Sequence, residues 1–226
     1  DLYDVLPISP FIGSNSWVIG ADKTKNGKVI FANDPHIGFS QPSVWFEAHL
    51  KSPEHEIYGY FLPIIPFPLL GHNNHIAYGL TMFENDDIDF YKEVNNLENS
   101  NKYQTPNGYA SYENTTKIIK VKDQKDLQFN FKTSRHGPII SGALGTVSDT
   151  SPVAISWIYT PVENHLLKAI YRMSTARNKE DFKKGVSMIH APGLNVMYGD
   201  AKGNIGWWAS AKLYKLNSHV NSKPTV

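Results

Sequence analysis

Short apolar runs separated by turn residues dominate the chain. Runs rich in β-branched and aromatic residues and bounded by Gly, Pro, Asn or Asp are typical of strands. They predict strands at residues 17–20, 28–32, 44–50, 76–81, 116–121, 127–132 and 205–209, and residues 137–140 and 154–157 extend the same pattern. Pro106-Asn107-Gly108 indicates a hairpin turn, and Asn33-Asp34-Pro35 predicts a turn directly after residues 28–32.

Two later segments have the period of amphipathic helices, residues 163–173 and 179–189. Asn178 is the expected N-cap of the second helix. The expected apolar faces consist of Leu166, Leu167, Ile170 and Tyr171 in the first helix and Phe182, Val186 and Ile189 in the second. Because strands come first and helices later, with a further strand at the end, we expect an α+β layered fold.

Composition excludes several classes of function. The 226 residues are 41% hydrophobic, which is enough for a core, and the net charge of +1 gives no indication of nucleic acid as a partner. No apolar stretch is long enough for a transmembrane segment. The chain has no cysteine, so a disulfide, a thiol nucleophile and a thiolate metal site are all excluded.

The Gly13-Ser14 step is the strongest candidate for chemistry. A small residue before Ser at the head of a β-like run is a possible self-cleavage point. Scission would leave Ser14 with both a hydroxyl nucleophile and a free α-amine, whose pKa of about 7.7–8.0 suits a base. Gly-Ser-Asn is also ordinary turn chemistry, so the tetrapeptide alone leaves a turn serine as the alternative.

Seven segments in order resemble the penicillin acylase (penicillin amidase) family of N-terminal-nucleophile hydrolases. They are GSNSWVI (13–19), NDPH (33–36), GHNNHIAYGLT (71–81), DDID (86–89), RHGP (135–138), PGLNVMYGD (192–200) and GNIGW (203–207). The resemblance implies a four-layer αββα sandwich, scission before Ser14, and hydrolysis of an amide that links an acyl group to an amine. It implies no organic cofactor and a periplasmic or extracellular location.

The resemblance also implies how the chain is organised. Residues 1–13 match the end of a spacer, and residues 14–226 match the N-terminal part of a β subunit, an incomplete catalytic domain. Its partners would be an α subunit and the remainder of the β subunit of the same precursor, together with a small-molecule acyl amide substrate. The family's second oxyanion donor lies further on than residue 226, so we expect the 226-residue chain alone to be inactive.

Three residues match the family's catalytic positions. Ser14 matches the nucleophile. His36 matches a position beside it, where an imidazole can hydrogen-bond the hydroxyl and tune proton transfer; a turn histidine that satisfies backbone groups is the alternative. Met82 matches the backbone N–H that donates to the oxyanion, so its side chain carries no information.

Three aliphatic residues, Ile37, Leu70 and Leu80, match positions that line the family's acyl pocket. Their shape favours a flexible alkyl chain over a flat aryl group. An equal alternative is that all three are plain core residues.

Asp86, Asp89 and the Ile88 carbonyl match a calcium site. Carboxylates with an intervening carbonyl suit a hard cation, so Ca²⁺ is expected in the full enzyme; solvated acids in a surface turn are the alternative. A different class of function also stays open, namely a non-catalytic binding or structural module that keeps the scaffold without activity.

Overall fold

The computed structural model describes residues 13–38, 40–83, 85–141 and 152–215. By their contacts these residues form two units: one spans Asp86–Pro161, and the other joins the chain up to Asn85 with the chain from Val162 onward. Apart from Gly13, the predicted spacer end lies outside the described residues. No helix in the described ranges is long and apolar enough to cross a membrane.

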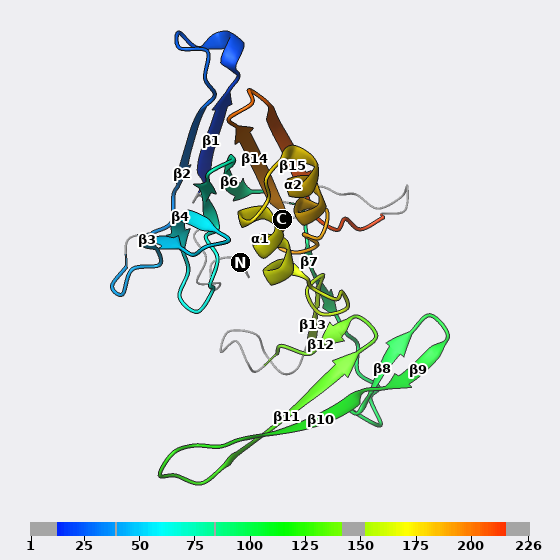
Figure 1. The fold of residues 1–226 in the computed structure, drawn as a ribbon. Helices are drawn as coiled ribbons and strands as arrows, with labels where there is room; N and C mark the ends of the chain where they lie inside the picture. Colours follow the sequence, from blue (N-terminus) through cyan, green and yellow to red (C-terminus); the bar gives the residue numbers. More distant parts are fainter. Residues whose placement is uncertain (1–12, 39, 84, 142–151, 216–226) are drawn as a thin grey trace. The chain divides into compact units, whose positions relative to one another are not determined.

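The unit that contains Ser14 is built on an antiparallel six-stranded sheet, with a separate two-stranded sheet beside it (Figure 1). The order of the larger sheet is β15-β14-β6-β5-β4-β3, and β1 pairs with β2. The elements are β1 (Ser14–Ile19), a 3₁₀ turn (Ala21–Lys23), β2 (Ile30–Pro35), β3 (Phe46–Lys51), β4 (Glu56–Phe61), β5 (Leu70–Asn73), β6 (Ile76–Met82), α1 (Leu166–Ser174), α2 (Lys179–Val186), β14 (Leu194–Asp200) and β15 (Ile205–Ser210).

The larger sheet has a different layer on each face, because alternate residues of a strand point to opposite sides. One face carries α1 and α2. The other face carries the β1–β2 hairpin: a side chain at Gly199 of β14 would meet Val18 and Phe31, and one at Gly79 of β6 would meet Asn33. The described part of this unit therefore has the layers helix, sheet and sheet.

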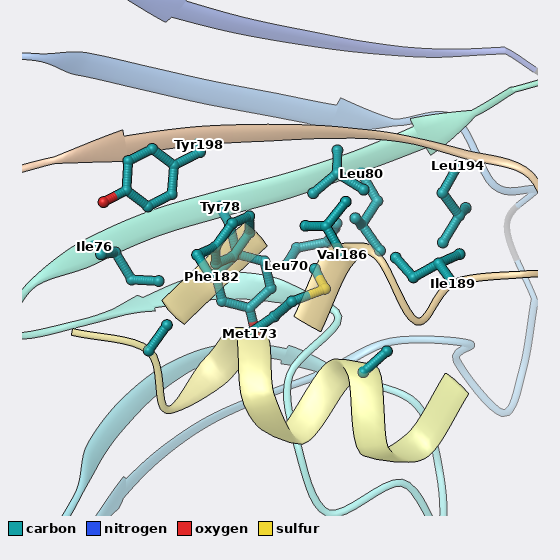
Figure 2. Packing of buried hydrophobic residues seen from close by; sticks show 13 residues of the cluster. Leu70, Ile76, Tyr78, Leu80, Met173, Phe182, Val186, Ile189, Leu194 and Tyr198 are labelled. Carbon is teal, nitrogen blue, oxygen red and sulfur yellow. The ribbon is translucent and has the colours of Figure 1, made fainter. Parts of the chain in front are cut away.

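The hydrophobic core fills the space between the sheet and the helices (Figure 2). Tyr78 and Tyr198 extend from neighbouring strands towards Phe182 of α2, whose ring centroid lies 5.6 and 5.0 Å from theirs. Phe182 has no exposed surface. The core also contains Leu70, Ile76, Leu80, Ala169, Met173, Ala176, Val186, Ile189, Leu194 and Val196.

The other unit contains antiparallel strand pairs, of which β10 and β11 form a long hairpin (Figure 1). Its strands are β7 (Ile88–Lys92), β8 (Lys102–Thr105), β9 (Gly108–Ser111), β10 (Glu113–Ile119), β11 (Leu127–Ser134), β12 (Gly137–Pro138) and β13 (Val153–Trp157). The hairpin predicted at residues 106–108 is confirmed by the pairing of β8 with β9. Inside this unit, the carboxyl of Glu93 is buried against His136, with 2.8 Å between Oε1 and Nδ1.

One local prediction is wrong, and another is right only in part. Asn33-Asp34-Pro35 continues β2 instead of forming a turn, because these residues pair with Ser16, Asn15 and Ser14 of β1. The face of α1 also differs. Leu167 and Tyr171 are 59% and 44% exposed, whereas Ala169 and Met173 are buried in the core. Ile170 is buried as expected, and Leu166 packs against the core. In both cases long-range packing outweighs the local pattern.

Candidate active site

Ser14 is the first residue of β1 and pairs with Pro35 at the end of β2. The backbone N–H of His36 lies between two acceptors: it is 3.1 Å from the carbonyl oxygen of Gly13 and 3.3 Å from Ser14 Oγ. One donor therefore contacts both the carbonyl of the Gly13–Ser14 peptide bond and the hydroxyl that follows it. The end of β2 positions the two groups that self-cleavage would require.

The imidazole of His36 is directed to Asp34 and not to Ser14. Its Nε2 lies 2.8 Å from Asp34 Oδ2, and both side chains are about half exposed, at 48% and 59%. An N–H on Nε2 donates to the carboxylate, which favours one orientation of the ring. In this geometry the contact between His36 and the hydroxyl is made by the backbone alone.

Asn33 links the strand of Ser14 to the six-stranded sheet. Its Nδ2 donates to the Asn15 carbonyl at 2.8 Å and to the Leu80 carbonyl at 3.2 Å, and its Oδ1 accepts from the Leu80 N–H at 2.8 Å. From the sequence, Asn33 was expected in a turn, with no role in the site. Had the strand been extended to Pro35, its alternation would have placed Asn33 on the same inward face as Phe31 and Pro35.

Met82 ends β6 with its side chain 56% exposed. Its carbonyl accepts from Asn195 Nδ2 at 3.0 Å, and the next N–H, that of Phe83, donates to the Gly193 carbonyl at 3.0 Å. Because backbone groups two residues apart on a strand point to the same edge, the Met82 N–H points the same way as the Leu80 N–H that Asn33 accepts. The predicted oxyanion donor is thus on the edge of β6 that faces Asn33.

A cavity of about 420 Å³ lies between β2 and the six-stranded sheet. Pro35, which is opposite Ser14 in the strand pairing, is part of its wall. The other lining residues are Phe31, Asn33, Trp45, Tyr58, Gly59, Tyr60, Leu70, Gly71, His72, Ala77 and Tyr78. The lining combines apolar and aromatic surface with few polar groups, as is usual for a small-molecule site.

The three predicted pocket residues do not all lie together. Leu70 and Leu80 are both 7% exposed and belong to the core between the sheet and the helices, and of the three Leu70 alone also lines the cavity. Ile37 is 46% exposed. The alternation of β2, which turns Phe31 and Pro35 inward, is the sequence signal that would have found more of the lining.

The predicted calcium ligands lie at the start of the other unit. Asp86 has a left-handed backbone with a φ of 52°, and Ile88 and Asp89 begin β7, paired with Trp157 and Ser156 of β13. Burial raises the pKa of the neighbouring Asp87 carboxyl, and the charge of Asp86 adds to this effect. Among the described residues no group of three or more His, Asp or Glu side chains is arranged to hold a metal. The donors are oxygens, as Ca²⁺ prefers, but two carboxylates and one carbonyl are fewer than the 6–8 ligands of a complete site.

Comparison with known proteins identifies the chain's relatives. The chain matches the penicillin amidase family over residues 1–225. It is 26% identical over 208 residues to the acyl-homoserine lactone acylase QuiP of Pseudomonas aeruginosa. The aligned region covers 88% of this chain and 24% of that protein. It is 27% identical over 202 residues to the penicillin acylase 2 proenzyme of Pseudomonas sp. strain SE83, covering 89% of this chain and 26% of that protein. The chain thus spans about a quarter of the length of these relatives.

The fold has a counterpart among solved structures. The thermostable penicillin G acylase of Alcaligenes faecalis superposes with a TM-score of 0.74 at 24% identity, over 87% of this chain and 35% of that one. This match confirms the expected α+β fold. The family match over residues 1–225 shows that the chain belongs to the penicillin amidase family.

Proposed function

We propose that this chain carries the nucleophile of an amidohydrolase that cleaves an N-acyl amide into an acid and an amine. The observation that carries the proposal is the shared N–H of His36, which contacts both the Gly13 carbonyl and Ser14 Oγ. A donor to the carbonyl oxygen of a peptide bond stabilises the charge that develops when a hydroxyl attacks it. The arrangement supports scission at Gly13–Ser14 and the release of Ser14 as a chain terminus.

After scission the Ser14 α-amine would serve as the base. It takes the proton of the hydroxyl while the oxygen attacks the acyl carbon, the amine product leaves with a proton, and water hydrolyses the acyl-enzyme. The Met82 N–H is the proposed donor to the oxyanion in this step. Removal of one such donor costs about 10²–10³-fold in kcat in comparable hydrolases.

The cavity beside Pro35 is the proposed site of the acyl group. Phe31, Trp45, Tyr60 and Leu70 supply apolar and aromatic wall. This lining suits an apolar acyl chain, aliphatic or aromatic, better than a charged one. The relatives include proteins named acyl-homoserine lactone acylase and penicillin acylase.

The remaining expectations belong to the whole protein. The partners proposed from the family are an α subunit and the remainder of the β subunit. Asp86, Asp89 and the Ile88 carbonyl would contribute to a Ca²⁺ site, where the ion supplies positive charge that holds these oxygens together. The proposed location is periplasmic or extracellular, which fractionation of the source cells tests.

The experiment uses the complete reading frame that contains these residues. Mass spectrometry of the purified protein should show a chain that begins at Ser14, and incubation with N-acyl amides should release a free amine. Ser14→Ala should abolish both, and Ser16→Ala, on the same strand, should keep both. A full-length protein that is never cut and never releases an amine would instead support a non-catalytic module on this scaffold.

A further inference from the structure

We infer that Asn33 is a positioning residue that sets the separation between the Ser14 nucleophile and the Met82 N–H. The inference rests on the proposed function and adds a residue to it. The hydrogen bonds of its carboxamide go to Asn15 and Leu80, and its side chain also lines the cavity proposed for the acyl group. It acts through Asn15, the neighbour of Ser14, and through Leu80, two residues before Met82.

On the edge of β6 that faces away from β14, the carboxamide of Asn33 bonds the backbone of Leu80 as a neighbouring strand would. The described pairing of β5 with β6 consists of Gly71 with Tyr78 and His72 with Ala77. Beyond Tyr78, the backbone N–H and carbonyl of Leu80 are both bonded to the side chain of Asn33, at 2.8 and 3.2 Å. A side-chain amide can satisfy both groups at once because it has a donor and an acceptor in one plane.

The same amide nitrogen holds the nucleophile strand. Asn33 Nδ2 donates to the Asn15 carbonyl at 2.8 Å, across the β1–β2 pairing. One planar group therefore fixes β1 against the edge of β6. Because the Met82 N–H points to that edge, rotation or loss of the carboxamide would change the position of the Ser14 hydroxyl relative to the donor.

Gly79 provides the space that makes this contact possible. A Cβ at position 79 would lie 2.0 Å from Asn33 Oδ1 and 2.7 Å from its Cγ, and the three nearest atoms all belong to Asn33. The side chain therefore lies directly on the backbone of β6. Gly79→Ala offers a way to displace the carboxamide without altering its chemistry.

The first test is Asn33→Asp in the complete protein, with a protease site inserted so that the mature chain begins at Ser14 even when self-cleavage is slow. An aspartate at position 33 can still accept from the Leu80 N–H. It has no amide donor, however, so its carboxylate would face the carbonyl oxygens of Asn15 and Leu80 and repel them. We expect kcat for an N-acyl amide to fall about 10²-fold, as for a misplacement of about 1 Å, with KM unchanged. The inhibition constant of a short alkylboronic acid, which forms a tetrahedral adduct on serine, should rise by the factor by which kcat/KM falls.

A double-mutant cycle separates positioning from folding. Gly79→Ala should reproduce the loss of kcat in the wild-type background and have a much smaller effect in the Asn33→Ala background, because the displaced group is then absent. Asn73→Asp is the matched control. Asn73 also bridges two elements, with bonds from Nδ2 to the Ser174 and Ala176 carbonyls at 2.9 and 2.8 Å, but at the far end of β5. It should lower thermal stability and leave kcat and the boronate affinity unchanged.

The outcomes are distinct. A wild-type protein that releases no amine overturns the proposed function and this inference together. An active wild-type protein whose Asn33→Asp variant keeps its kcat and its boronate affinity overturns the inference alone. Equal losses of kcat in Asn33→Asp and Asn73→Asp would also overturn it, since they would reflect stability and not the geometry of the site.

Discussion

The backbone N–H of His36, and not its imidazole, contacts the Ser14 hydroxyl oxygen, at 3.3 Å. The imidazole is bonded to Asp34 instead. Any residue other than proline at position 36 can supply the N–H. The identity of the side chain should therefore matter less to the hydroxyl than the path of the chain through Pro35 and His36.

The first prediction concerns this contact. His36→Gln should lower kcat for an N-acyl amide by much less than the about 10²-fold that loss of a general base brings. His36→Pro removes the donor and should cause a far larger loss in kcat, with circular dichroism used to check that the variant is folded. Steady-state kinetics of the mature variants decides the matter. A loss of 10²-fold or more in His36→Gln would assign the chemistry to the imidazole.

A second prediction concerns the core behind the site. Phe182 is fully buried, with ring centroids of Tyr78, Tyr198 and Trp208 at 5.6, 5.0 and 5.9 Å. Phe182→Ala leaves a cavity among these rings and should lower the free energy of unfolding by about 3–5 kcal/mol in urea titrations. Leu167→Ala on α1 is the control. Its side chain is 59% exposed, so the expected change is within about 0.5 kcal/mol.

A third prediction tests the proposed calcium site. The midpoint of thermal unfolding of the complete protein should be higher in excess CaCl₂ than in EDTA, by linkage to binding of the folded state. Asp89→Asn should remove most of this difference, and so should Asp86→Asn, since asparagine tolerates the left-handed backbone at position 86. MgCl₂ is the control ion. Equal midpoints with and without CaCl₂ would contradict the proposal.

Local signals in the sequence predicted those parts of the fold that local chemistry decides. The Asn-Gly turn between β8 and β9 is one. Asn178 is another: its Oδ1 accepts from the Asp181 N–H at 2.9 Å and caps α2 as expected. The predicted strand at residues 76–81 is β6, one residue longer at its end. Each of these depends on contacts within a few residues.

The features that the sequence did not predict depend on distant contacts. Asn33 was assigned to a turn because Asn-Asp-Pro is turn-like, whereas the residue that satisfies its amide, Leu80, is 47 residues away. The inner face of α1 was misassigned because Leu167 and Tyr171 are apolar, while the sheet has room for Ala169 and Met173. The cavity wall combines residues of β2 with residues of the six-stranded sheet. It could not be assembled from the sequence while β2 was expected to end before Asn33.

The fourth prediction concerns acid stability. Asp200, 8% exposed, accepts four hydrogen bonds: Oδ2 from Tyr198 and Asn204 side chains at 2.8 and 2.9 Å, and Oδ1 from the Lys202 and Asn204 N–H groups at 2.9 Å each. Burial alone would raise the pKa of Asp200, but these donors outweigh it and hold the pKa below its ordinary value of 3.8. Asp200→Asn places an amide donor among donors and should cost about 1–3 kcal/mol at neutral pH.

The sign of the pH dependence follows from that lowered pKa. Folded Asp200 keeps its charge to lower pH than the unfolded chain does, so its contribution to stability is complete above 3.8 and is lost as the pH falls through the folded-state pKa. Urea unfolding at a series of pH values should therefore show a constant gap between wild type and Asp200→Asn above that value and a narrowing gap below it. Asp181→Asn, at a carboxyl about half exposed and bonded to Lys184, should show a much smaller gap throughout, because solvent screens that pair. A gap that widens as the pH falls would mean that the donors around Asp200 do not stabilise its charged form.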